Sequence, residues 1–131
     1  MMTSKNTRAT VAAFIAALAL IMGATTAGAQ LRGPLSITNN TSCTVGVCDA
    51  NGTVCVAVPP GNTTIDIPCN TTAIGIRSCA GLRVIPLGQC LNSVGVGNTC
   101  CATICFVPGI VGCTFFLTIN PSPTPCLCPH D

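Results

Sequence analysis

The sequence predicts a small all-β domain, an antiparallel β-sandwich or barrel-like fold stapled by disulfides, that follows a cleaved helical signal peptide. Short apolar stretches recur about every ten residues between glycine, proline and asparagine turns, which is typical of a sandwich or barrel. No stretch after the signal peptide has helical periodicity. The chain of 131 residues contains 12 cysteines. At that density in a secreted protein, disulfides are the expected state.

A secretory signal peptide is predicted for residues 1–29. Lys5 and Arg8 give it a basic start, an apolar run follows, and small residues precede Gln30. This order is typical of a signal peptide, and we expect cleavage between Ala29 and Gln30. The apolar run is shorter than a transmembrane helix, so the sequence predicts no transmembrane segment.

The mature chain is expected to comprise a disulfide-rich β domain at residues 30–120 and a Pro/Cys-rich C-terminal tail at residues 121–131. We expect one or both cysteines of the tail to tie it to the domain. All cysteines are disulfide candidates: Cys43, Cys48, Cys55, Cys69, Cys79, Cys90, Cys100, Cys101, Cys105, Cys113, Cys126 and Cys128. Their pairing stays open, because spacing alone does not determine connectivity.

The clearest element is a β-hairpin that turns at Asn51-Gly52. Asn-Gly favours a type I′ turn, which needs a positive φ at both central residues. This placement puts Cys48 opposite Cys55 and sets the valines of both strands on one face, as alternation requires. In the same register the two cysteines form a hydrogen-bonded pair, the wider kind of antiparallel pair. A disulfide between them is compatible with this arrangement but not required by it.

The other strands are predicted from apolar alternation between turn residues. In chain order they are a short edge strand at 35–37 and strands at 63–69, 71–79, 82–87, 103–107 and 113–119. Pro59 and Pro60 indicate a turn or a crossover between strands, because proline cannot donate to a central ladder. The glycine-rich stretch 88–98 is expected to be a loop. Packing between two sheets favours core positions for both Phe115 and Phe116.

Charge is scarce in the mature chain. Its three arginines and three aspartates cancel: Arg32, Arg77 and Arg83 against Asp49, Asp66 and Asp131. No basic patch is available for nucleic acid or for an anionic membrane surface. A nearly neutral, apolar-rich protein is expected to self-associate, because little charge keeps its copies apart.

Two cysteine clusters could in principle hold a metal or carry redox chemistry. The first is Cys100, Cys101 and Cys105, and the second is Cys126-x-Cys128-x-His130. Zinc sites use cysteine and histidine ligands, but usually in more regularly spaced pairs. In an oxidising compartment disulfides are the favoured fate of these thiols. We therefore predict no metal site and no cofactor.

Residues for catalysis are few. The single histidine, His130, lies next to the C-terminus, and the chain contains no glutamate. Asp49 and Asp66 are far apart in sequence, so only folding could bring the two carboxylates together. A thiol nucleophile would need a nearby base, which the sequence does not supply. We predict no catalytic residue and expect the protein not to be an enzyme.

Three fragments resemble fungal hydrophobins, small secreted disulfide-rich proteins that coat air–water interfaces. They are Gln89-Cys-Leu-Asn-Ser-Val94, Cys100-Cys101 and Gly109-Ile-Val-Gly-Cys-Thr114. The likeness covers a small part of the chain. It also departs from the family, whose pattern has two Cys-Cys doublets where this chain has one. The resemblance implies interfacial activity as an alternative function.

Together these features predict a secreted, non-enzymatic structural or cell-surface protein that acts by self-association or adhesion. Its expected partner is itself or another surface or matrix component, and its expected location is extracellular, or the periplasm or envelope in a bacterium. One alternative is a soluble binding or inhibitor module that presents loops such as 59–62 or 88–98. The others are a hydrophobin-like coat protein and a small redox or metal-binding protein.

Overall fold

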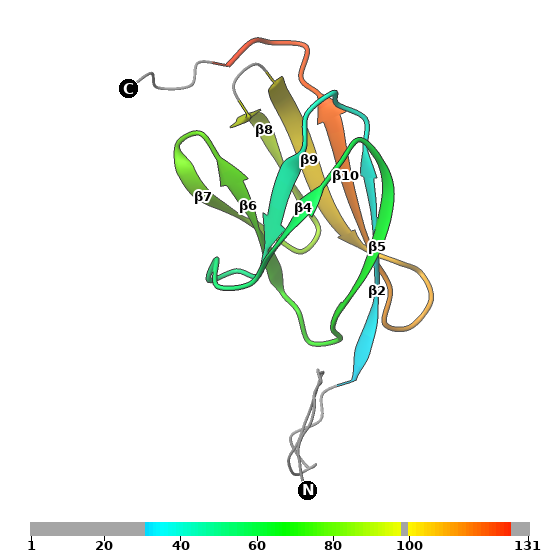
Figure 1. The fold of residues 1–131 in the computed structure, drawn as a ribbon. Coiled ribbons are helices and arrows are strands. Elements are labelled where there is room, and N and C mark those ends of the chain that lie inside the picture. The colour runs from blue at the N-terminus through cyan, green and yellow to red at the C-terminus, as the bar shows by residue number, and fades with distance from the viewer. Residues whose placement is uncertain (1–30, 98–99, 127–131) are drawn as a thin grey trace, which may run out of the picture. The chain divides into compact units, whose positions relative to one another are not determined.

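Two β-sheets pack face to face in the computed structural model, which describes residues 31–97 and 100–126 (Figure 1). This part of the chain contains no helix, so the all-β prediction is confirmed, as a sandwich. The predicted signal peptide with its cleavage site at Ala29 and Gln30 lies outside the described residues, as do Cys128 and His130.

Nine strands form the two sheets. The first sheet contains β2 (Arg32–Asn39), β5 (Gly61–Pro68), β8 (Gln89–Val96), β9 (Cys100–Pro108) and β10 (Phe115–Pro121). Its spatial order is β5-β2-β10-β9-β8, and β10 runs parallel to β2. The second sheet contains β3 (Val45–Cys48), β4 (Cys55–Val58), β6 (Ala73–Ser78) and β7 (Gly81–Pro86), in the order β4-β3-β6-β7. All its pairings are antiparallel.

The core lies between the sheets and consists of aliphatic side chains around one aromatic pair. The rings of Phe106 and Phe115 stack with their centroids 5.8 Å apart. Burial follows the alternation of the strands, as in Ile74 and Ile76 of β6, which point inward while Arg77 points outward. Burial of such side chains is the main stabilising term of the fold, because it removes apolar area from water.

The predicted edge strand at 35–37 is instead a central strand. β2 is longer than predicted and lies between β5 and β10. Its neighbour β10 comes from the far end of the chain and pairs with it in parallel, Leu117 opposite Ile37. Local sequence holds no sign of a parallel partner so distant, which explains the error.

The predicted loop at 88–98 is also wrong, because most of it forms β8. The strand pairs with β9 and buries Val94 and Val96. Its register shifts between Leu91 and Val94, and Ser93 within this bulge has a φ of 56°. A bulge interrupts the two-residue alternation of a strand, so the pattern does not read as a strand in the sequence.

The hairpin register is confirmed, but its turn is not type I′. Cys48 lies opposite Cys55, as predicted. Gly52 has a positive φ of 74° while Asn51 does not. The Gly52 N–H donates to the Asp49 carbonyl at 3.0 Å, and the Asp49 N–H donates to the Val54 carbonyl at 3.0 Å. Because that bonded pair lies next to the cysteines, Cys48 and Cys55 are a non-hydrogen-bonded pair with Cα atoms 4.0 Å apart, not the wide pair expected.

Asn39 ties the two sheets together at one end. It ends β2 and is 2% exposed. Its Nδ2 donates to the carbonyls of Cys43, just before β3, and of Val58, the last residue of β4, at 2.8 and 3.1 Å. Its Oδ1 accepts from the backbone N–H and the hydroxyl of Thr41. One buried amide of the first sheet therefore satisfies polar groups of the second sheet and of the connection between β2 and β3.

We predict that Asn39→Ala lowers the free energy of unfolding by roughly 2–4 kcal/mol, because two carbonyls lose their donor in a buried setting. Asn40→Ala is the matched control. Its side chain is exposed and bonds Asn120 at 2.6 Å, so we expect a loss below about 1 kcal/mol. Urea unfolding followed by far-UV circular dichroism measures both. Equal losses in the two variants would contradict this role of Asn39.

Candidate functional site

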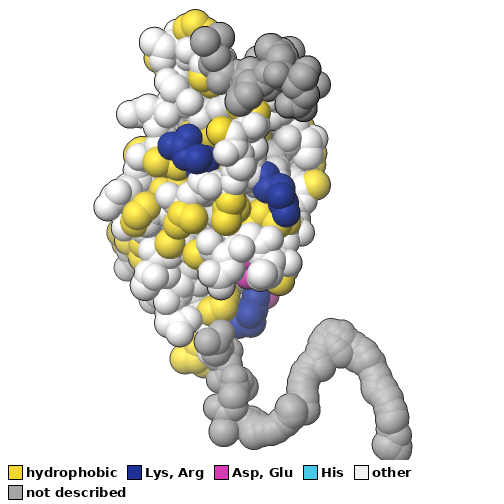
Figure 2. Space-filling model, turned by 90° about the vertical axis from the view of Figure 1, so that its left-hand side faces the viewer, with side chains coloured by type: hydrophobic (Ala, Val, Ile, Leu, Met, Phe, Trp, Pro, Cys, Tyr) yellow, Lys and Arg dark blue, Asp and Glu magenta, His cyan; other side chains and the backbone are white. Residues whose placement is uncertain are grey.

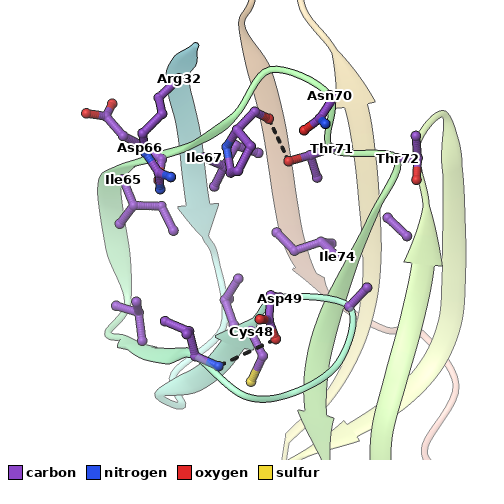
Figure 3. Close-up of a pocket in the computed structure, with 16 residues that line it drawn as sticks. Arg32, Cys48, Asp49, Ile65, Asp66, Ile67, Asn70, Thr71, Thr72 and Ile74 are labelled. Carbon is purple, nitrogen blue, oxygen red and sulfur yellow. Dashed lines mark hydrogen bonds between the residues drawn. The ribbon is translucent and has the colours of Figure 1, made fainter. Parts of the chain in front are cut away.

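An open groove lies along the side of the sandwich where β4 and β5 are the edge strands of their sheets (Figure 3). Its volume is about 500 Å³. On the opposite side, the backbone N–H of Cys79 donates to the Gly95 carbonyl of β8 at 2.9 Å, joining the β6–β7 turn to the first sheet. The sandwich is thus linked along one side and hollowed along the other.

The floor and walls of the groove are aliphatic. Val47 and Ile74 are buried at its floor, while Ile65 and Ile67 of β5 are half-buried. Val54 forms part of the hairpin wall and is 68% exposed. Ile65 and Ile67 pack against the core, as alternation predicted, but the opposing sheet covers them only in part. The groove can therefore bind apolar groups.

Charged and polar residues lie at the rim. Asp66 of β5 and Asp49 of the hairpin both line the groove, although they are distant in sequence. They come from different walls (Figure 3). Arg32 donates from Nη2 to the Asp66 backbone carbonyl at 2.8 Å. Thr71, in the connection after β5, donates its hydroxyl to the Pro68 carbonyl at 2.6 Å.

Asp49 is the structural centre of the hairpin turn. Its carboxylate accepts the Thr53 hydroxyl at 2.6 Å and the Thr53 N–H at 2.8 Å. These bonds, led by that of the hydroxyl, hold the pKa of Asp49 below its usual value. The carboxylate competes with the tighter turn favoured by Asn51-Gly52, because it satisfies N–H groups inside the wider loop.

We predict that Thr53→Val raises the pKa of Asp49 toward 3.8, its usual value. The folded-state pKa lies below the unfolded one, so ionised Asp49 stabilises the turn above about pH 3.8, and this stabilisation is lost as the pH falls through the folded-state pKa. Titration of the Asp49 carboxyl carbon by NMR measures the shift. Thr63→Val, on β5, is the control and should leave the titration unchanged. An unchanged pKa in Thr53→Val would contradict the proposed cause.

Disulfides occupy the candidate cysteines of the described region. Five bonds join Cys43 to Cys100, Cys48 to Cys55, Cys69 to Cys113, Cys90 to Cys105, and Cys101 to Cys126. Cys79 is disulfide-bonded too, and the described residues include no free cysteine. Five such bonds indicate an oxidising environment, as found outside the cell.

The predicted cysteine cluster at 100–105 is divided among three partners. Cys100 bonds the segment before β3, Cys101 bonds the C-terminal tail through Cys126, and Cys105 bonds the neighbouring strand β8. Sulfur in a disulfide is not a thiolate, the form that binds zinc or attacks a substrate. The bond to Cys126 fastens the tail to the start of β9.

We predict that the disulfides differ in their contribution to stability according to the segment that they close. Cys43–Cys100 spans 57 residues and Cys48–Cys55 spans 7. In the chain-entropy model, removal of the pair by C43A/C100A lowers the free energy of unfolding by about 4 kcal/mol, and C48A/C55A lowers it by about 2 kcal/mol. Urea unfolding of both variants measures the difference. A larger loss for the hairpin pair would refute the prediction.

Comparison of the chain with protein-family models, curated proteins and solved structures gives no match. Within residues 31–97 and 100–126, the structure has no helix with the length and hydropathy to cross a lipid bilayer. The groove is a feature that the sequence did not predict as a site. Its signal in the sequence is the valines of the β3–β4 hairpin and the isoleucines of β5, which the alternating pattern predicts only as ordinary core residues.

Proposed function

We propose that this protein is a secreted, non-enzymatic structural protein of a cell surface or extracellular matrix, and that it acts by self-association. The observation that carries the proposal is a cluster of exposed apolar side chains at the β9–β10 hairpin. Ile110 is fully exposed and Val111 is 69% exposed at the tip of the loop, while Val107 and Phe116 pair across the strands below it. We call these four residues the β9–β10 patch.

Phe116 adds to this patch against expectation. The sequence favoured a core position for both phenylalanines, but only Phe115 is buried. Successive residues of a strand point to opposite faces, so Phe116 lies on the outer face of the first sheet. A contiguous exposed apolar patch marks an interaction surface more often than an isolated residue does.

The low charge of the surface supports the same proposal. The described residues include only three arginines and two aspartates, and Figure 2 shows one face where a few charged groups are separated by uncharged polar and hydrophobic side chains. Repulsion between copies is therefore weak near neutral pH. The disulfides support a location outside the cell, where such bonds persist.

A second candidate function is that of a binding module, and the groove favours it. The loops that the sequence offered for this role are not available as predicted, because residues 61–62 belong to β5 and residues 89–96 form β8. The groove between β4 and β5 replaces them. Its aliphatic lining fits an uncharged, apolar segment of a partner.

We predict that the protein, recovered from an oxidising secretion host, associates reversibly in a concentration-dependent way. Sodium sulfate should strengthen the association, because it favours burial of apolar surface, while sodium chloride up to about 0.5 M should not weaken it, because charge pairs contribute little. Sedimentation velocity over a concentration series measures both effects. A monodisperse monomer at every concentration and salt would overturn the proposed function.

A further inference from the structure

We infer that the groove of one copy binds the Ile110–Val111 loop tip of a second copy. This inference rests on the proposed self-association and names the two surfaces that carry it. One chain holds both an apolar projection and an apolar groove. Ile110 is fully exposed in its own molecule, so the tip does not fill the groove of the same copy.

The loop is held in shape before any partner binds. The Gly109 N–H donates to the Thr114 carbonyl at 2.8 Å and closes the loop, and the Thr114 hydroxyl donates to the Val111 carbonyl at 2.6 Å. The disulfide from Cys113 to Cys69 fixes its base. Figure 1 shows the β9–β10 connection projecting from the end of its strands. A rigid loop loses little conformational entropy on binding, which raises affinity.

The loop itself is built around Gly109. A Cβ at this position would lie 3.2 Å from Cε2 of Phe116 and would collide with the Thr114 side chain. The Phe116 ring therefore packs on the base of the loop and supports it. Two aliphatic side chains, Ile110 and Val111, remain exposed at the tip. A partner that covers them would remove their apolar area from water.

The groove has the size and chemistry to supply that cover. A closed cavity of about 150 Å³ holds one benzene molecule. The groove, at about 500 Å³, has room for an isoleucine and a valine side chain together. Ile65, Ile67 and Val54 would contact them, and these residues are at most half-buried in the single molecule.

Charge also favours this occupant over a charged peptide. The stretch 107–114 contains no charged residue. Arg32, Asp49 and Asp66 lie at the rim of the groove and not at its floor. A charged side chain on the aliphatic floor would lose its hydration without gaining a partner. The side chains of Ile110 and Val111 are apolar, so their burial carries no such desolvation cost.

The contact joins two different surfaces of the molecule. Such a contact is heterologous and forms open chains or closed rings. The exception is a pair in which each copy inserts its tip into the groove of the other. Assembly by this route gives a structural protein a means of polymerising without a second component.

The test uses two variants that disable one surface each. I110S/V111S removes the projection and leaves the groove, while Val54→Lys places a charge on the groove wall and leaves the projection. All three positions are exposed, so both variants should fold. Val84→Lys, on the outer face of β7 and 43% exposed, is the matched control for the added charge. Far-UV circular dichroism and a free-thiol count verify folding.

We expect each disabling variant to weaken self-association at least about tenfold in sedimentation velocity, the minimum for exposing one buried aliphatic side chain, and Val84→Lys to behave as wild type. Mixing the two disabling variants should restore one contact between intact projection and intact groove, and so give a 1:1 complex that does not grow further.

The outcomes separate the inference from the proposed function. If the wild type associates and I110S/V111S associates equally well, or if the mixed variants stay monomeric, the loop-in-groove contact is wrong while self-association stands. If Val84→Lys weakens association as much as Val54→Lys does, the groove is not the receptor and the inference is overturned. If the wild-type protein never associates, both the inference and the proposed function are wrong.

Discussion

The buried amide of Asn39 is the interaction on which the arrangement of the two sheets depends. From the end of β2 it bonds the carbonyl of Cys43, just before β3, and that of Val58, at the end of β4, so it fixes both sheets at one end. The disulfide from Cys43 to Cys100 strengthens the same end. The Cys48–Cys55 disulfide lies within the β3–β4 hairpin. Cys69, directly after β5, bonds to Cys113 in the β9–β10 connection of the same sheet. Neither bond joins β4 to β5. The sandwich can therefore remain open along this side.

Disulfides add to the stabilisation that the apolar core provides. A chain of this size buries a limited fraction of its surface on folding, and disulfides compensate by restricting the unfolded state. Two of the bonds, Cys48–Cys55 and Cys90–Cys105, cross directly between neighbouring strands. They stabilise strands whose edges carry little apolar cover, as in β4, where Val58 alone is buried.

This stability permits an unusual surface. Exposed aliphatic groups at Ile110, Val111 and Val54 would endanger a marginally stable domain, because partial unfolding would expose still more apolar area. In a stapled sandwich they can persist as specific features. A projection and a groove of matching chemistry on one neutral molecule give a physical basis for ordered association in place of nonspecific aggregation.

The sequence by itself determined the all-β class, the hairpin register and the inward faces of most strands, because turn chemistry and two-residue alternation are local properties. It did not determine the turn type, since the Asp49 carboxylate outcompetes the preference of Asn51-Gly52, nor β8, whose alternation is broken at Ser93. Disulfide partners, the parallel pairing of β2 with β10, and the groove were decided by tertiary structure alone. Alternation predicts that Val56 and Ile65 face inward, but only the separation of the two sheets decides whether other side chains cover them.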